Sequence, residues 1–146
     1  MAYTYGTSNY SANGLSATAL CDIETSAADS VRLMDVEHRQ AVGVGTTQIG
    51  LGRPANTPVG IGPIGFIADD PGSNVPAART FLFTNWSTAP TVPAAFFRRY
   101  STTSVVGTGV LWTWPQGLAV APSAGLVLWN ITGGSPLYSQ WEIEEG

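Results

Sequence analysis

Strand-like alternation in the last third of the chain limits the fold more than any other feature. Val110, Trp112 and Trp114 alternate there with Leu111 and Thr113. A two-residue period of this kind is typical of a strand with one buried face. We therefore predict a strand at this position, with its tryptophans turned toward a core.

Turn residues separate this strand from two further ones. Pro115-Gln116-Gly117 is predicted to end it and turn the chain, and residues 133–136 are predicted to form the next turn. Between these turns, residues 126–131 are nearly all apolar, which is typical of a central strand covered on both faces. Residues 137–144 then alternate between apolar and polar, so we predict an amphipathic closing strand with Trp141 on its inner side.

The earlier part of the chain repeats the pattern in shorter pieces. Residues 15–24 alternate, with Cys21 on the apolar face, where it is interpreted as a small buried group. Residues 43–65 hold too many Gly and Pro for a helix, and residues 80–86 and 92–100 are further strand candidates. Roughly eight to ten short strands at near-regular spacing predict an all-β fold. We expect an antiparallel β-sandwich or jelly-roll-like domain that extends from residue 15 to residue 146.

Two segments allow more than one interpretation. Residues 26–41 lack Gly and Pro, so a helix near residues 26–40 is possible, but a strand from Val31 to Val36 is preferred because the flanking chain is β-like. Residues 1–14 are Tyr, Ser, Asn, Gly and Thr without an amphipathic period. They are predicted to form an extended N-terminal arm, either disordered alone or laid against a neighbour. A frayed terminus without a role is the alternative.

Low charge is the main feature of the composition. Only 11% of the residues are charged and 44% are hydrophobic, so a single domain can bury a core. Its surface is expected either to be solvated mostly by Ser, Thr, Asn and backbone groups or to be covered by other copies of the chain. No Lys occurs and the net charge is -4. A basic footprint for nucleic acid is therefore missing, and no apolar run is long enough to span a membrane.

Candidate catalytic groups are few. His38 is the only histidine, which excludes a His-based metal cluster within one subunit, and no Ser has the context of a nucleophile elbow. Asp69-Asp70 and the acidic segment 142–145 resemble carboxylate pairs for glycoside cleavage or Ca²⁺ binding, but solvated charges at loop and strand ends are the preferred interpretation. We predict no catalytic residue, no cofactor and no metal, and hence not an enzyme.

One glycine-rich segment matches a nucleotide-binding pattern by chance. Gly60-Ile61-Gly62-Pro63-Ile64-Gly65 has the glycine spacing of the dinucleotide fingerprint. The fingerprint requires a following helix whose N-terminus faces the pyrophosphate, and residues 66–71 offer none. We interpret the segment as turns between short strands.

Aromatic residues are the candidate contact residues. Tyr3, Tyr5 and Tyr10 supply large contact area at modest entropy cost, so we predict that they contact a neighbouring subunit. Trp86 is less constrained by strand patterns than the other tryptophans and joins them as a candidate interface residue. Stacking of exposed tryptophans on carbohydrate is the alternative.

Several segments together resemble small virion structural proteins of tailed bacteriophages and related prophage genes. They are Gly50-Leu51-Gly52-Arg53-Pro54, Ala68-Asp69-Asp70, Phe97-Arg98-Arg99, the run 109–118, the run 126–130 and the run 141–145. The resemblance covers roughly residue 21 to the C-terminus. It implies a β-rich particle component, a capsid decoration or cement protein on the head, and leaves open which part of the particle it occupies.

Two function classes follow. The first is a structural virion protein that stabilises the phage head through subunit contacts, with other copies of itself in a trimer or ring and the phage major capsid protein as partners. Its expected location is the virion surface after synthesis in the host cytoplasm, without nucleic-acid or membrane partners. The second is a tail- or fibre-associated β-module that binds host-surface carbohydrate.

Overall fold

Every described element of the structure is a β-strand. The structure, a computed structural model, describes residues 2–11, 17–26, 31–43, 45–70, 72, 74–122, 125–134 and 136–146, and no helix occurs in these ranges. The strands are β1 (Tyr3–Ser11), β2 (Thr18–Thr25), β3 (Val31–Gln40), β4 (Gln48–Gly52), β5 (Val59–Ile61), β6 (Ile64–Gly65), β7 (Ile67–Ala68), β8 (Thr80–Phe83), β9 (Asn85–Thr88), β10 (Phe96–Ser101), β11 (Gly109–Val120), β12 (Leu126–Thr132) and β13 (Leu137–Glu145).

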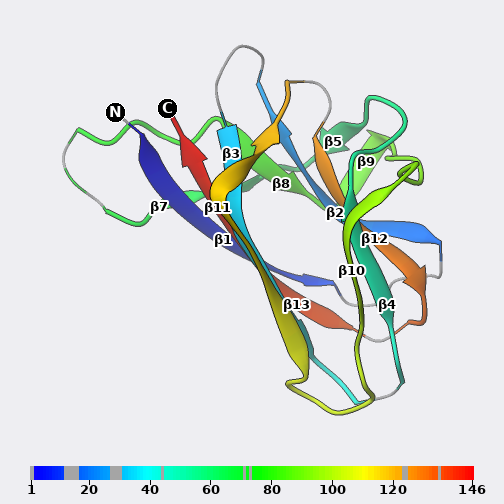
Figure 1. Cartoon of the computed structure of the whole chain (residues 1–146). Helices are drawn as coiled ribbons and strands as arrows, with labels where there is room; N and C mark the ends of the chain where they lie inside the picture. The colour runs from blue at the N-terminus through cyan, green and yellow to red at the C-terminus, as the bar shows by residue number, and fades with distance from the viewer. Residues whose placement is uncertain are drawn as a thin grey trace.

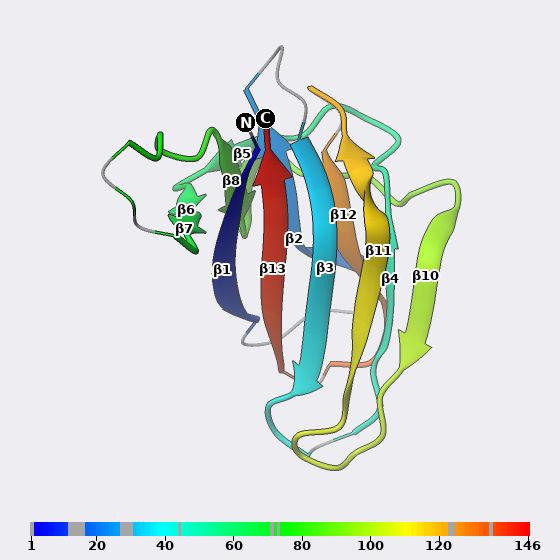
Figure 2. The same cartoon turned by 60° about the vertical axis from the view of Figure 1, so that its left-hand side comes forward.

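The strands form two sheets that lie face to face, with a small third sheet to one side (Figures 1 and 2). Sheet A has five strands in the order β11-β3-β13-β1-β7, and sheet B has six in the order β10-β4-β12-β2-β8-β6. β5 and β9 pair with each other as a ribbon. The predicted all-β class with antiparallel sheets is confirmed, and the arrangement is consistent with a β-sandwich.

Strand pairing is nested, so the two ends of the chain meet. β1 pairs with β13, β2 with β12, β3 with β11 and β4 with β10, all antiparallel. The N- and C-termini consequently lie side by side (Figure 1). Because early strands pair with late ones, most contacts are distant in sequence, and we expect folding to be slow for a chain of this size.

The core lies between the inner faces of the two sheets. On β13 the predicted alternation is confirmed, since Leu137, Ser139, Trp141 and Ile143 are buried, and Tyr138, Gln140, Glu142 and Glu144 are more exposed. The indole N–H of the buried Trp141 donates to Ser139 Oγ at 3.1 Å, so its polar atom is satisfied inside the core. The central position predicted for residues 126–131 is also confirmed, because β12 pairs with β4 on one side and with β2 on the other.

Two of the sequence interpretations concern β3 and β11. The strand interpretation of residues 31–36 is confirmed, since β3 continues to Gln40, while residues 27–30 of the possible helix lie outside the described residues.

The prediction that Pro115-Gln116-Gly117 ends its strand is wrong. β11 continues to Val120, and the ladder with β3 instead shifts register between Thr113 and Leu118. A bulge accommodates the missing proline N–H without ending the strand.

The predicted N-terminal arm is corrected for the residues that can be described. Residues 3–11 form β1, which lies between β13 and β7 in sheet A. Tyr5 is 1% exposed and its hydroxyl donates to the backbone oxygen of Pro76 at 2.9 Å. The reason is that β13 would otherwise present an unpaired edge, and β1 satisfies its backbone groups over nine residues. Residues 12–14 of the predicted arm lie outside the described residues.

A third layer, formed by the β5–β9 ribbon, covers part of the outer face of sheet B. Trp86 of β9 donates its indole N–H to Asp22 Oδ1 on β2 at 2.7 Å. The backbone N–H of Gly60 on β5 donates to Glu24 Oε2 at 3.3 Å. Asp22 is therefore fully buried, although its alternation with apolar residues placed it on a polar face. Alternation identifies the two faces of a strand but cannot show that a second layer covers the polar one.

Replacement of Gly60 by alanine is expected to loosen this ribbon. A Cβ at Gly60 would collide with the ring of Phe83, which fills the space between the ribbon and sheet B, so the variant should lose about 1–3 kcal/mol of unfolding free energy. Denaturant unfolding measures the loss. Gly65→Ala is the matched control, because nothing lies within 4 Å of a Cβ there. Equal unfolding free energies for the two variants would contradict this packing.

Candidate functional site

The four residues predicted as contacts do not form one surface. Tyr5 is in the core and is corrected as a contact residue, while Tyr3 is half-buried and packs against that core. Trp86 is half-buried, with its N–H held by Asp22. Tyr10 remains accessible, being 47% exposed on the outer face of sheet A. Tyr3 and Tyr5 occupy inward-facing positions of β1, which explains why they pack on the core and not at the predicted interface.

Tyr10 belongs to an exposed aromatic pair. It lies directly opposite Tyr138 in the register of β1 and β13, and the two ring centroids are 5.0 Å apart. Both side chains are about half exposed, at 47% and 54%. Paired aromatic rings on an open sheet face offer apolar contact area to a partner.

The fold encloses His38 and Cys21, two side chains with potential catalytic chemistry. His38 is fully buried between the rings of Trp112 and Trp141, and burial lowers its pKa to about 3, so it is neutral at pH 7. Both of its ring nitrogens lack a hydrogen-bond partner. Cys21 is a buried free thiol whose pKa is raised by burial, first of all, and by Asp22. Neither can act as a base or nucleophile on a substrate in solution.

Asp22 and Glu24 form a carboxylate pair beneath the ribbon that the sequence did not single out. Each has one oxygen bound to an N–H of the ribbon, from Trp86 and Gly60, and one buried oxygen without a donor. Burial raises the pKa of Asp22 to about 8, and Glu24 adds to the rise. Asp22 has no exposed surface and is not accessible to a substrate, whereas Glu24 is half-buried and lines a hollow of about 240 Å³ beside Pro58 and Val59.

The strongest candidate for binding is an edge of the sandwich where both sheets end. β10 is the last strand of sheet B and β11 the last strand of sheet A, on the same side of the molecule (Figures 1 and 2). Their backbones are not joined by a ladder, so the side chains must close the gap. We call these residues the arginine-aromatic edge: Arg53, Phe96, Phe97, Arg98, Arg99 and Trp114.

Two arginines of this edge connect the ends of the two sheets. The Arg98 guanidinium lies 5.6 Å from the ring centroid of Trp114 on β11. The Arg53 guanidinium lies 5.4 Å from the ring centroid of Phe97, and its Nη2 donates to the backbone oxygen of Ala119 at 2.9 Å. Cation-π contacts of this kind contribute about 0.5–2 kcal/mol each, depending on desolvation. They hold the guanidinium groups in fixed positions at the surface.

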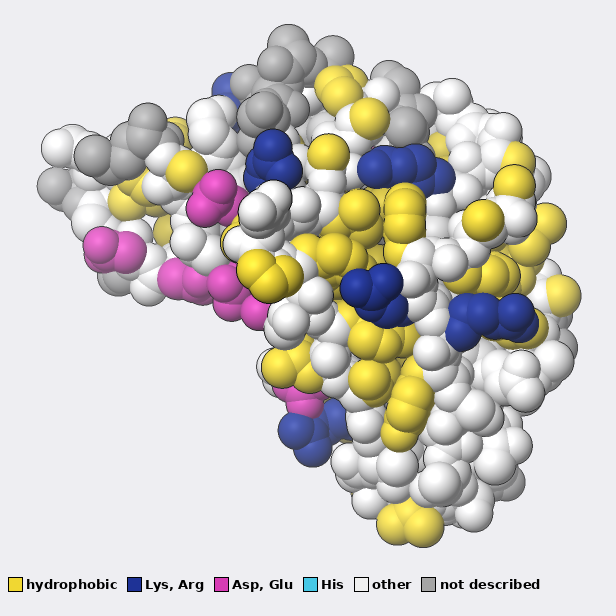
Figure 3. Space-filling view, viewed as in Figure 1, with side chains coloured by type: hydrophobic (Ala, Val, Ile, Leu, Met, Phe, Trp, Pro, Cys, Tyr) yellow, Lys and Arg dark blue, Asp and Glu magenta, His cyan; other side chains and the backbone are white. Residues whose placement is uncertain are grey.

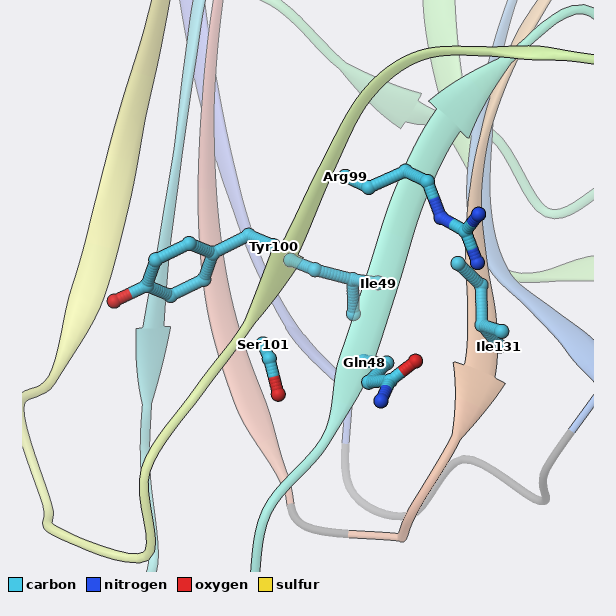
Figure 4. A pocket seen from close by; sticks show the side chains of 6 residues that line it. All are labelled: Gln48, Ile49, Arg99, Tyr100, Ser101 and Ile131. Carbon is cyan, nitrogen blue, oxygen red and sulfur yellow. The ribbon is translucent and has the colours of Figure 1, made fainter.

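Arg99 extends the edge onto the outer face of sheet B. Its guanidinium lies 5.6 Å from the ring centroid of Phe96. That ring covers Gly50 of β4, where a Cβ would approach a ring atom to 2.5 Å, so only glycine permits this packing. In Figure 4 the Arg99 side chain extends toward Ile131, and the two line a hollow of about 270 Å³.

Positive charge on this edge is not neutralised. No Asp or Glu occurs between Asp70 and Glu142, and no described carboxylate forms an ion pair with Arg53, Arg98 or Arg99. Figure 3 shows hydrophobic and arginine side chains together at the centre of this view, while acidic side chains gather toward its left-hand side. Arginines held over rings are suited to bind carboxylates or rings of a partner.

The sequence of residues 96–100 has a feature typical of a contact surface, which a search for strand alternation does not detect. Phe96 to Tyr100 alternate poorly, which weakens them as an ordinary strand, yet they join two arginines to three aromatic residues within an acid-free stretch. Trp114 had been assigned to a buried face with Trp112, and the structure leaves it half-buried. Its contact with Arg98 depends on the two sheets ending side by side, which no local pattern predicts.

The described ranges contain neither a cluster of metal-binding side chains nor a membrane-spanning helix. Among the residues that the structure describes, no three His, Cys, Asp or Glu side chains converge where they could hold a metal ion. No helix in the described part of the chain has the length and apolar character to cross a membrane. The glycine-rich segment 60–65 forms parts of β5 and β6 around Gly62, whose φ is 67°, and this confirms its interpretation as a turn.

Comparisons of the chain with protein-family models, with curated proteins and with solved structures find no significant match. The resemblance to phage virion proteins therefore stays a prediction.

Proposed function

We propose that the chain is a structural protein of a tailed-phage particle that binds the head as a decoration or cement protein. The observation that carries the proposal is the arginine-aromatic edge, where fixed guanidinium groups without acidic partners lie beside the exposed ring of Phe97. The cation-π contacts hold these arginines in the monomer but leave their charge unneutralised, whereas an interface with an acidic partner uses both the charge and the apolar surface. The virion surface is the proposed location and the host cytoplasm the proposed place of synthesis.

The strand order supports a finer proposal for the fold, a jelly roll. In this fold a long antiparallel hairpin is folded over so that its strands alternate between two four-stranded sheets. The nested pairs β1–β13, β2–β12, β3–β11 and β4–β10 agree with it, and β5 to β9 would be an insertion between the fourth and fifth strands. Jelly rolls occur in viral capsid proteins and also in lectins, so the fold alone does not decide the function.

A cement protein of this kind acts through mass action. It binds the assembled lattice of the major capsid protein and not the free subunits, so each bound copy shifts the equilibrium toward the intact particle. Contact area and charge complementarity are sufficient for this role. The partners we propose are the major capsid protein and further copies of the chain, in a trimer or a ring.

Co-sedimentation with empty heads of the phage that encodes the chain tests the proposal. We expect wild-type protein to sediment with the heads, and the double variant Arg98→Glu, Arg99→Glu to lose at least ten-fold in affinity, because like-charge juxtaposition at an interface costs several kcal/mol. Thr88→Glu is the control, since it adds a negative charge at an exposed residue on the ribbon. Wild-type protein that binds tails and no heads would overturn the cement role.

A specific observation also favours the second candidate, a carbohydrate-binding module of a tail or fibre. A hollow of about 360 Å³ lies beside Trp114 and the bulge of β11, and a half-buried tryptophan next to a hollow can stack on a sugar ring. Titration of tryptophan fluorescence with host-surface polysaccharides tests this candidate. A saturable change that disappears in Trp114→Ala would favour it over the cement role.

A further inference from the structure

The outer face of sheet A carries an acidic hollow. Asp35 on β3 lies directly opposite Glu142 on β13, and Glu142 lies opposite Gly6 on β1. Together these strands line a hollow of about 230 Å³ that opens to solvent. Asp69 approaches from beyond β7, because a Cβ at Gly6 would lie 3.4 Å from Asp69 Oδ1.

The carboxylates of this hollow repel one another in the isolated chain. Like charges directly opposite on neighbouring strands are destabilising. Partial burial, Glu37 and Asp69 raise the pKa of Asp35, while partial burial, Asp35 and Asp69 raise the pKa of Glu142. Of the described arginines, Arg39 forms an ion pair with Glu37, and none pairs with Asp35 or Glu142. Among the described residues, the charges of Asp35 and Glu142 are therefore not neutralised by an arginine of the same chain.

A guanidinium group fits this requirement. It is planar, it remains charged at any pH of interest, and its fork of N–H donors matches carboxylate oxygens. The hollow is several times larger than the roughly 30 Å³ that one water molecule occupies in the liquid, so the end of a side chain can enter it. The exposed rings of Tyr10 and Tyr138 lie further along the same two strands, on the same face. They offer apolar surface beside the charges.

We propose that the arginine-aromatic edge of one copy binds the acidic hollow of a second copy, with one guanidinium group in the hollow, so that copies associate head to tail. This inference rests on the proposed function in one respect, since it names the partner of the arginine-aromatic edge. The edge lies where the two sheets end and the hollow lies on the outer face of sheet A, so one copy can use both surfaces at once. An interface between two different surfaces produces a ring where the rotation closes and a filament where it does not.

Edge-to-edge pairing of two β10 strands is the competing arrangement. It would use the free backbone groups of an edge strand, but it would place arginines of one copy against arginines of the other. Like-charge juxtaposition costs several kcal/mol at an interface. Charge complementarity therefore favours the acidic hollow as the partner surface, and the two arrangements give different results when variants are mixed.

The test uses two variants of the full chain in sedimentation velocity at low salt. The edge variant carries Arg98→Glu and Arg99→Glu, and the hollow variant carries Glu142→Arg. We expect the wild type to associate and each variant alone to be monomeric. A one-to-one mixture should give a heterodimer, because it contains one intact edge and one intact hollow. Thr88→Glu should associate like the wild type, and circular dichroism checks that all variants are folded.

The results separate this inference from the proposed function. A mixture that stays monomeric, a hollow variant that associates like the wild type, or a wild type that is monomeric at every concentration would overturn head-to-tail association. Binding to phage heads is measured separately for the wild type. A monomer that binds heads would refute this inference and leave the cement role standing, and association without head binding would do the reverse.

The variant Glu142→Gln gives a second test, because it should raise the thermal stability of the isolated protein and weaken its self-association. It removes one of two facing charges, so the midpoint of thermal unfolding of the isolated protein should rise by about 1–3 °C at pH 8, where both carboxylates are charged. The same change should weaken self-association at least three-fold. A variant that associates as tightly as the wild type, or that loses both stability and association, would contradict a role for Glu142 at the interface.

Discussion

Deletion of residues 2–11 is expected to abolish the cooperative unfolding transition of the protein. The deletion removes β1, which pairs with β13 along nine residues, and leaves β13 as an open edge. It also removes Tyr5, a fully enclosed aromatic side chain whose loss alone costs about 3–5 kcal/mol. Total stabilities of domains are only about 5–15 kcal/mol, so little remains.

Thermal unfolding followed by far-UV circular dichroism measures this effect. Tyr5→Phe is the matched control, because it keeps the ring and loses only the hydrogen bond to Pro76, at a cost of about 1 kcal/mol. We expect a slightly lowered but cooperative transition for this variant. A deletion variant with the transition of the wild type would contradict the position of β1 in sheet A and would restore the N-terminal arm as an independent segment.

The second large effect concerns pH. Unfolding free energy should decrease as the pH rises from about 6.5 to 8, because Asp22 is protonated in the folded protein up to its raised pKa of about 8 and is charged in the unfolded chain above 3.8. Over this interval folding takes up a proton, and the decrease is about 1.4 kcal/mol per pH unit. A group with a raised carboxyl pKa contributes stability at low pH and loses it through the folded pKa.

His38 has the opposite influence. Its folded pKa of about 3 lies below the ordinary value of 6.5, so the unfolded chain binds a proton that the folded protein does not. Stability from this group is complete above pH 6.5 and is lost as the pH falls toward 3. Between about pH 4 and 6.5 the slopes of Asp22 and His38 cancel, so these two groups together leave the unfolding free energy nearly unchanged there.

Asp22→Asn separates the two contributions. The amide oxygen still accepts the indole N–H of Trp86, so the ribbon stays attached, but the decrease between pH 6.5 and 8 should disappear. Relative to the wild type, the variant should gain about 2 kcal/mol over this interval, as measured by urea unfolding at each pH. Asp70→Asn, at an exposed loop carboxylate, serves as control. A wild-type curve that stays flat to pH 8.5 would show that Asp22 is not buried as described.

Local sequence patterns predicted the strands in which burial either alternates regularly or covers both faces. β13 alternates cleanly and β12 is nearly all apolar, so both could be assigned from the sequence. β1 also has Tyr3 and Tyr5 at a two-residue period, but the residues between and after them are polar, and the segment looked like an arm. Its place in sheet A is decided by the free edge of β13, which lies at the other end of the sequence.

The remaining differences have the same origin in long-range packing. Asp22 is buried because the β5–β9 ribbon folds over sheet B, and neither the ribbon nor its position follows from the alternation of β2. Arg98 could be located in the sequence but not paired, because Trp114 belongs to the other sheet. Side chains on edges and outer faces depend on which strands become neighbours, and this information is not local.

Hydrogen-deuterium exchange of the free and the head-bound protein tests the central claim most directly, namely that the arginine-aromatic edge is the contact surface on the particle. In the free protein, the outward backbone N–H groups of β10 have no partner strand, so they should exchange rapidly. Binding to heads should protect residues 96–101 and 109–114, while the exposed amides of the ribbon, residues 85–88, should exchange as before. Protection confined to the ribbon, with unchanged exchange along β10 and β11, would contradict the account.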